Sequence, residues 1–348
     1  MRAPTEIAGL VVDCHAHYIP DCLIEVLSAG EQFPGIEVRT AGEELRFSFP
    51  DLGMSPPAPA RISCLADFTS WLDSNGIDVQ ILSPWTDLLG YTLAEDEACG
   101  WVSYLNDSMI SAVSGNDRFA TLAGIPLPHT DAAVAEIRRA RSTGHVGIVI
   151  GTAAPGAELD DPRLDPVWAE LARTGMPVLL HPVFLARDPR LREHGMANAV
   201  GRAHETTIAL SRLLLSGTLA RHPGLRMIAA HGGGTLPFLL RRLQRAHELS
   251  PGSSAPAEAF GRLYVDSVVL DPRVLAALLT MIDTSRVLLG SDYPFPWEPD
   301  PVGLIGAVPA ARQAAGAILG GNACEIFGLR NSPASKGLHG EREPEDTR

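Results

Sequence analysis

The chain has 348 residues, 45% of them hydrophobic and 20% charged, so it can bury a large core and is unlike a disordered or fibrous protein. Its net charge of −13 and its pI near 5.3 disfavour nucleic acid and anionic membranes as partners, because both would repel it. No apolar stretch of about 20 residues appears and the N-terminus lacks the apolar centre of a signal peptide, so we expect a cytoplasmic protein with no membrane partner.

Short apolar runs recur along the chain, and helix-like stretches separate all but the first two of them. The eight runs are residues 10–12, 79–82, 121–127, 146–150, 177–180, 226–230, 263–265 and 287–289. Repeated β-α units of this kind are typical of a parallel sheet with helices outside it. Eight units predict an α/β fold, a (β/α)8 TIM barrel that forms a single domain over residues 1–330.

The connection between the first two runs, about residues 18–75, is too long for a simple loop. Within it, residues 36–39 and 45–49 flank Ala41-Gly42 and predict a small hairpin. We expect this insertion to cover one end of the barrel. At the other end of the chain, residues 331–348 are rich in acidic side chains and predict a disordered tail.

Start and stop signals are present for the helices that separate the runs. Asp131 is expected to cap a helix over residues 132–141. The pair Asp165-Pro166 is expected to open a helix that Gly175 ends, which places the next strand directly after it.

The segment Asp13-Cys14-His15-Ala16-His17 follows the first apolar run. The period of a strand puts both imidazoles on the same side, facing inward at the barrel mouth. Two polar residues on a solvated strand face would look the same, but the position after the first strand favours a metal site. Cys14 is expected to be a reduced, buried thiol, because the five cysteines never have the C-x-x-C spacing of a zinc knuckle.

Three later runs also end in a residue that can bind a metal or transfer a proton. They are His181, His231, which is followed by three glycines, and Asp292, whose following loop contains two prolines. A strand-end cap, a tight strand-to-helix turn and an N-cap aspartate are the respective alternatives. Because strand ends of one barrel converge on its C-terminal mouth, where barrel active sites lie, we favour a shared catalytic site.

His15, His17, His181 and Asp292 can supply three nitrogens and one oxygen to a metal and still leave a place for water or substrate. We expect one divalent ion per chain, Zn²⁺ with Mn²⁺ as the alternative, since the fourth run ends without a lysine or acidic ligand for a second ion. His231 is then left to take or give a proton, or to act as a fifth ligand. Asp266, after the seventh run, lines the site with no assigned role.

Together, the motifs at residues 13–20, 181–182, 231–234 and 290–296 make the sequence resemble the amidohydrolase superfamily. Within it, the sequence is similar to the group of 2-amino-3-carboxymuconate-6-semialdehyde decarboxylase and its relatives, roughly over residues 10 to 330. The resemblance implies a metal-dependent, non-oxidative decarboxylase of an unsaturated or aromatic carboxylic acid. In it His231 activates the metal-bound water, and His231 or Asp292 supplies a proton. It further implies that Arg61 and Arg242 bind substrate carboxylates, Arg242 across a homodimer interface.

The same metal centre serves more than one reaction class in such barrels. The alternative activity is a metal-dependent hydrolase or hydratase of a lactone, amide or enol acid, in which His231 protonates the leaving group. A third hypothesis is a metal-binding barrel that has lost catalysis and only binds its ligand.

Overall fold

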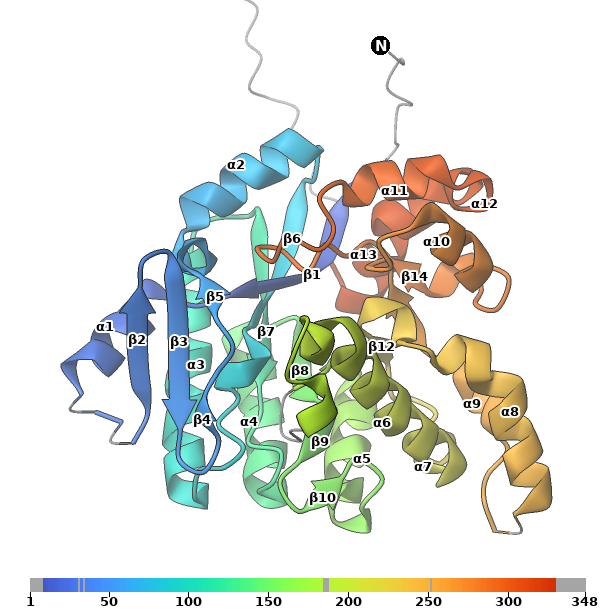
Figure 1. Cartoon of the computed structure of the whole chain (residues 1–348), viewed down its shortest axis with the longest axis horizontal. Coiled ribbons are helices and arrows are strands. Elements are labelled where there is room, and N and C mark those ends of the chain that lie inside the picture. The colour runs from blue at the N-terminus through green and yellow to red at the C-terminus, as the bar shows by residue number, and fades with distance from the viewer. Residues whose placement is uncertain (1–8, 31, 34, 184–187, 251, 330–348) are drawn as a thin grey trace, which may run out of the picture.

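The computed structural model describes residues 9–30, 32–33, 35–183, 188–250 and 252–329. Eight parallel strands form one sheet in the order β1-β6-β7-β8-β11-β12-β13-β14 (Figure 1). Their bounds are Val12–Tyr18, Val79–Pro84, Phe119–Gly124, Gly147–Gly151, Val178–His181, Met227–Ala229, Tyr264–Asp266 and Val287–Leu288.

The segment that follows β14 closes the sheet onto β1. The backbone N–H of Cys14 donates to Leu289 at 2.9 Å, and Ala16 forms a parallel bridge with Tyr293. The last strand therefore meets the first, and the predicted TIM barrel is confirmed.

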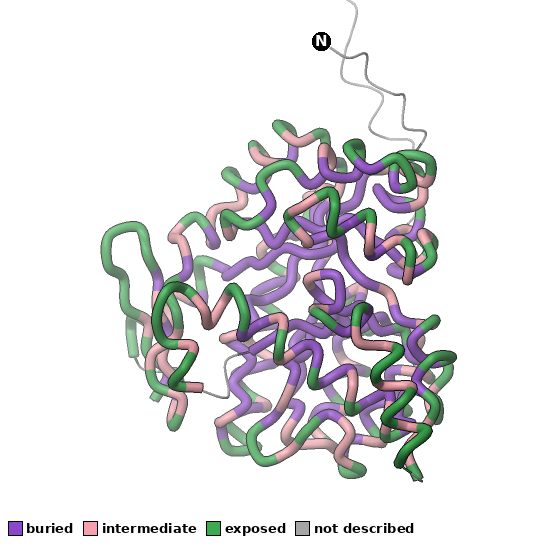
Figure 2. The backbone as a smooth tube through the Cα atoms, turned by 45° about the vertical axis from the view of Figure 1, so that its right-hand side comes forward, coloured by how far each residue is buried: buried purple, intermediate pink, exposed green. Residues whose placement is uncertain are grey.

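Helices surround the barrel and connect its strands (Figure 1). They are α1 Asp21–Ala29, α2 Leu65–Asn75, α3 Glu95–Val113, α4 Thr130–Thr143, α5 Asp165–Thr174, α6 Ala203–Leu215, α7 Thr218–Arg221, α8 Leu236–Leu249, α9 Pro256–Phe260, α10 Pro272–Leu278, α11 Pro301–Ala307, α12 Pro309–Gln313 and α13 Asn322–Phe327. Figure 2 shows that the buried backbone is concentrated in the middle of the molecule, whereas the outer helices alternate between buried and exposed positions. This alternation is what an amphipathic helix packed on a barrel requires.

Two local expectations for helices had different outcomes. Helix α5 carries Pro166 in its first turn and ends at Gly175, whose φ of 68° is left-handed, so this expectation is confirmed. Asp131 does not cap α4, because the helix begins at Thr130 and His129 occupies the N-cap position without a side-chain bond. Asp131 lies in the first turn instead, where its charge complements the helix dipole.

The first strand is longer than its apolar run. It extends to Tyr18, so the motif that contains His15 and His17 lies within the strand and not after it. The apolar run ends early because Asp13 points inward and accepts hydrogen bonds from Gln80 and Ser291. The third apolar run, residues 121–127, extends beyond its strand. Strand β7 ends at Gly124, but Ile125 and Leu127 after it are still apolar and buried.

The insertion between β1 and β6 forms a small antiparallel sheet. The expected hairpin is present as β2 (Glu37–Ala41) and β3 (Glu44–Phe49), and the short strands β4 (Gly53–Met54) and β5 (Ala58–Pro59) also pair with β3. Phe47 of β3 packs with Trp85 and Trp101 in a second hydrophobic cluster. This sheet therefore lies against the segment that follows β6. The division at residue 330 and the disordered tail stay predictions, because residues 331–348 lie outside the described part of the chain.

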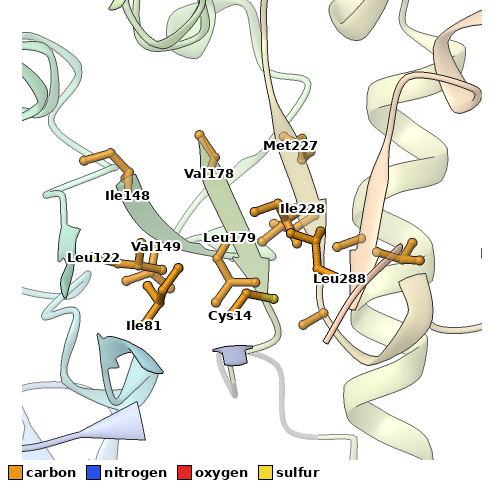
Figure 3. Close-up of a cluster of buried hydrophobic side chains, with 14 of the residues drawn as sticks. Cys14, Ile81, Leu122, Ile148, Val149, Val178, Leu179, Met227, Ile228 and Leu288 are labelled. Carbon is orange, nitrogen blue, oxygen red and sulfur yellow. The ribbon is translucent and has the colours of Figure 1, made fainter. Parts of the chain in front are cut away.

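Apolar side chains from the strands fill the main core (Figure 3). Cys14 is completely buried among them, close to Leu179. Burial, together with the charges of Asp266 and Asp13, raises the pKa of its thiol well above the ordinary value. The expectation of an inert, buried thiol is therefore confirmed. Among the described residues, no helix has both the length and the apolar character needed to cross a bilayer.

Close packing at Gly320 gives a test of the closed barrel. Gly320 lies in the π-helix η8 (Ala317–Gly321), and a Cβ there would overlap the Leu10 carbonyl. Gly320→Ala is expected to lower the free energy of unfolding by about 3 kcal/mol, because the backbone must shift. The control is Gly316→Ala, where a Cβ has open space, and it should stabilise by about 1 kcal/mol. Equal urea denaturation curves for the two variants would contradict this packing.

Candidate metal centre

The residues predicted to bind metal come together at the C-terminal mouth of the barrel. His15 and His17 project from β1, His181 is the last residue of β11, and Asp292 follows β14. These four side chains are buried, and one ligand atom from each lies within 4.8 Å of the others. The four can therefore hold a metal ion.

The spacing of the donor atoms suits first-row metal bonds. Nε2 of His15 lies 3.2 Å from Nε2 of His17, and Oδ1 of Asp292 lies 3.0 Å from His17 Nε2 and 3.5 Å from His15 Nε2. Ligands about 2.0–2.1 Å from a tetrahedral ion are separated by about 3.3 Å. These separations agree with that geometry.

Hydrogen bonds on the far side of each ring orient the three histidines. Nδ1 of His15 donates to Asp266 at 2.6 Å, Nδ1 of His17 lies 3.0 Å from the Ser83 hydroxyl, and Nδ1 of His181 donates to the Pro182 carbonyl at 3.0 Å. The carboxylate and the carbonyl can only accept, and the Ser83 hydroxyl donates to the Ala16 carbonyl at 3.1 Å. Each contact therefore favours the proton on Nδ1 and leaves Nε2 free to bind a metal. The three rings are therefore set in the same tautomer.

An unpartnered nitrogen supports a bound cation at this place. Within the described residues, Nε2 of His181 is buried and has no hydrogen-bond partner. Nε2 of His15 and of His17 face each other although neither carries a proton when Nδ1 does. A positive ion between them would satisfy all three nitrogens, so the residues present fit a divalent metal.

The protonation states also fit metal binding. Burial lowers the pKa of His17 to about 4 and the pKa of His181 well below its usual value. Burial alone would raise the pKa of Asp292, but the neighbouring imidazoles of His17 and His231 hold that pKa well below the usual range. His17 and His181 are therefore neutral imidazoles and Asp292 is a carboxylate at neutral pH, which are the forms that bind metals. Burial alone would lower the pKa of His15, but its hydrogen bond to Asp266 and the nearby carboxylates raise that pKa.

His231 lies at the edge of the cluster. Its Nε2 is 3.6 Å from Oδ2 of Asp292, and its side chain is 17% exposed, more than the buried ligands around it. His231 and Asp292 both have left-handed backbones, with φ of 56° and 61°. Such conformations are costly for residues other than glycine and concentrate at functional sites.

The glycines after His231 form the tight strand-to-helix turn that was one of the two alternatives. Gly232, Gly233 and Gly234 all have positive φ, and a Cβ on Gly234 would lie 2.5 Å from the Ala203 carbonyl. Backbone N–H groups of His231 and Gly232 donate to the carboxylate of Asp266 at 3.0 and 2.9 Å. The turn therefore fixes His231 relative to the same aspartate that orients His15.

Asp266, which had no assigned role in the sequence, is the link between His15 and His231. Both carboxylate oxygens of Asp266 accept hydrogen bonds from N–H groups. In Asp266→Asn an NH2 group, which cannot accept, replaces one of these oxygens, so at least one hydrogen bond is lost. We expect about 10- to 100-fold weaker metal affinity, measured by competition with a chelator. The control is Asp283→Asn, the same change at an exposed cap whose oxygen accepts from Ser285. Unchanged affinity in Asp266→Asn would remove Asp266 from the metal centre.

Two cavities lie at this side of the barrel, and three of the four metal-binding residues line the smaller one. The smaller one, of about 20 Å³, has room for about one water molecule. It is lined by His17, Trp85, His181, Asn198, Arg202, Asp292, Phe295 and Trp297. The larger one, of about 490 Å³, is within the range of small-molecule sites and is lined partly by Phe47 and Phe49 of β3. The insertion therefore contributes a wall to the larger cavity, which approaches the metal centre at Thr86, whose hydroxyl lies 3.0 Å from Nδ1 of His181.

The two arginines expected to bind substrate are not brought into the small cavity. Arg61 is exposed and donates to the Pro294 carbonyl at 2.9 Å, in the loop after Asp292. Arg242 is exposed on α8. The arginine that does line the small cavity is Arg202, which carries no motif in the sequence because it lies in an irregular segment after β11. The roles of Arg61 and Arg242 stay predictions.

Comparison with known proteins places the chain in a family. A family model described as amidohydrolase matches residues 12–329. The chain is 34% identical to 2-amino-3-carboxymuconate-6-semialdehyde decarboxylase of Dictyostelium discoideum, over 74% of this chain and 75% of that protein. It is 30% identical to gamma-resorcylate decarboxylase of Rhodococcus jostii, over 64% of this chain and 75% of that protein.

Solved structures show the same fold. A dihydroxybenzoic acid decarboxylase from Polaromonas, with bound manganese and the inhibitor 2-nitroresorcinol, superposes with a TM-score of 0.74 at 20% identity. The match covers 92% of this chain and 98% of that one. The family match and the identity to the Dictyostelium protein agree with the cluster of three histidines and an aspartate at the barrel mouth. The chain therefore belongs to the amidohydrolase family.

Proposed function

We propose that this protein is a carboxy-lyase: a metal-dependent, non-oxidative decarboxylase of an unsaturated or aromatic carboxylic acid. The observation that carries the proposal is the buried cluster of three histidines and Asp292, with His231 beside it at the barrel mouth. The two relatives that share 34% and 30% of their aligned residues with this chain are both decarboxylases of carboxylic acids. The cluster in this chain and the shared family support the same reaction class here.

His15, His17, His181 and Asp292 would hold one divalent ion. Three nitrogens and one oxygen favour zinc, and the manganese bound by the related Polaromonas barrel makes manganese the alternative. When bound, such an ion polarises an oxygen ligand and brings the pKa of bound water close to neutral.

The remaining chemistry falls to His231 and Asp292. Loss of CO2 leaves an electron pair on the carbon that carried the carboxylate, and a proton must reach that carbon to complete the product. His231 is the partly exposed group at the edge of the cluster, and its Nε2 lies 3.6 Å from Oδ2 of Asp292. We assign proton transfer to this pair.

A homodimer with Arg242 at the interface is part of the proposal. Helix α8 carries Arg242 and two exposed apolar side chains, Phe238 at 54% and Leu249 at 65% exposure. An exposed apolar stripe of this kind suits burial against a second copy. We also propose a cytoplasmic location, which rests on a sequence without an apolar stretch of about 20 residues.

Product analysis tests the proposed reaction. Purified protein loaded with zinc or manganese is incubated with a panel of hydroxybenzoic and muconic acids, and CO2 release is measured together with the organic product. The proposal expects CO2 and a product that lacks one carboxylate. Addition of water to a lactone, amide or enol acid without CO2 would support the hydrolase or hydratase alternative. Binding without turnover of any acid would support a barrel that has lost catalysis.

A further inference from the structure

A short π-helix forms one wall of the small cavity. This helix, η5 (Ala197–Arg202), leads directly into α6 and presents Asn198 and Arg202 to the cavity that His17, His181 and Asp292 also line. Ala197 and Gly201 of the same helix line the larger cavity. The helix thus borders both spaces, and π-helical turns are often found at functional sites.

Arg202 is buried and held in a defined position. It is 8% exposed, and its Nη1 donates to the Pro182 carbonyl at 3.0 Å. Pro182 follows His181 directly, so this bond ties the guanidinium to the metal centre. The other head nitrogen, Nη2, lies 4.0 Å from Oδ2 of Asp87. Burial of an arginine is costly unless an anion compensates it, and Asp87 offsets part of this cost.

A positive charge at this place has a chemical use. The chain has a net charge of −13, so a carboxylate substrate needs a local cation to approach the metal centre. A guanidinium presents a planar fork of donors that matches a carboxylate with two parallel hydrogen bonds. The indoles of Trp85 and Trp297 and the ring of Phe295 line the same small cavity, which leaves space for a small polar group and not for a whole aromatic ring.

We propose that Arg202 binds the carboxylate of the substrate beside the metal centre, while the rest of the acid extends into the larger cavity. This inference rests on the proposed function in one respect, that the substrate is a carboxylic acid. Because CO2 carries no charge, the contact weakens as the carbon–carbon bond breaks. Arg202 therefore acts in substrate binding, and its loss should affect KM more than kcat.

Calorimetric binding of a matched pair of ligands tests the proposal. The ligands are 2,6-dihydroxybenzoate and resorcinol, its neutral decarboxylated counterpart, measured on metal-loaded and on metal-free protein. Arg202→Met should weaken binding of the acid about 10- to 100-fold. It should leave resorcinol binding within about twofold. Arg202→Lys should recover part of the acid affinity, since it restores the charge without the fork.

Two further variants make the test specific. Arg226→Met removes another arginine that donates to one backbone carbonyl, at the opposite end of the barrel, and should leave both affinities unchanged. Asp87→Asn removes the negative charge near Nη2 of Arg202 and should tighten binding of the acid. This effect is opposite in sign to that of Arg202→Met, and it can be measured even if Arg202→Met does not fold.

The outcomes separate this inference from the proposed reaction. Equal losses of acid and resorcinol affinity in Arg202→Met, or unchanged acid affinity in that variant, would overturn the role of Arg202. Absence of acid binding by the wild type would do so too. A wild type that releases CO2 while Arg202→Met binds the acid normally leaves the reaction standing and the inference refuted. If Arg202→Met selectively loses acid binding but the wild type releases no CO2, the inference about Arg202 stands and the proposed reaction is refuted.

Discussion

His181→Ala is expected to remove the bound metal and to reduce turnover to background. His181 contributes the buried Nε2 that has no partner within the described residues, and its loss leaves two histidines and one carboxylate around the ion. Because loss of a mere supporting contact costs about 10- to 100-fold in metal affinity, loss of a ligand should cost at least 100-fold. Elemental analysis of the purified variant and its rate of CO2 release check the prediction.

The matched control for this variant is His222→Ala. His222 is a partly buried histidine whose ring bonds Asp165 on the outside of the barrel, so its removal should leave the metal in place. Chelator-treated wild type should lose activity and regain it when zinc or manganese is added back. Full activity of a wild-type preparation without any divalent metal would refute the metal centre.

His231 should be needed for turnover but not for metal binding. Replacing His231 removes the imidazole that lies 3.6 Å from Asp292, and loss of a positioned proton-transfer group costs about 10²- to 10⁴-fold in kcat. The variant of choice is His231→Asn, because asparagine tolerates the φ of 56° found here better than alanine does. Metal content and kcat are measured on the same preparation.

The two quantities together decide the role of His231. Full metal content with strongly reduced kcat is the expected result. Loss of the metal along with activity would make His231 a fifth ligand, which was the alternative role. Unchanged kcat would exclude His231 from proton transfer, and comparison with His181→Ala shows what loss of the metal alone looks like.

Much of the fold could be predicted because local patterns carry it. Buried parallel strands appear as short apolar runs, and each strand end that holds a histidine or an aspartate stands out against such a run. His15, His17, His181, His231 and Asp292 could therefore be proposed as one site before any coordinates. A closed barrel with these residues at its mouth follows from that pattern, since parallel strands bring their C-terminal ends to the same edge.

Other features depend on contacts between residues far apart in the chain. Asp266 was visible only as a polar residue after a strand, but its carboxylate accepts from His15, 251 positions away, and from the turn at His231. Arg61 and Arg242 were chosen by resemblance, and both are exposed outside the small cavity. The residue that is buried there, Arg202, belongs to a π-helix, whose period no helical or strand pattern reveals.

By itself, the sequence determined the class of this protein and the residues of its candidate metal centre, because the period of apolar residues and the chemistry of single side chains can be read from local sequence. The tertiary structure decided which nitrogen of each histidine faces the centre, that Asp266 joins two strand ends, and which arginine lies beside the ligands. The physical reason is that tautomers, buried charge and cavity walls depend on neighbours that only the closed barrel brings within hydrogen-bonding distance.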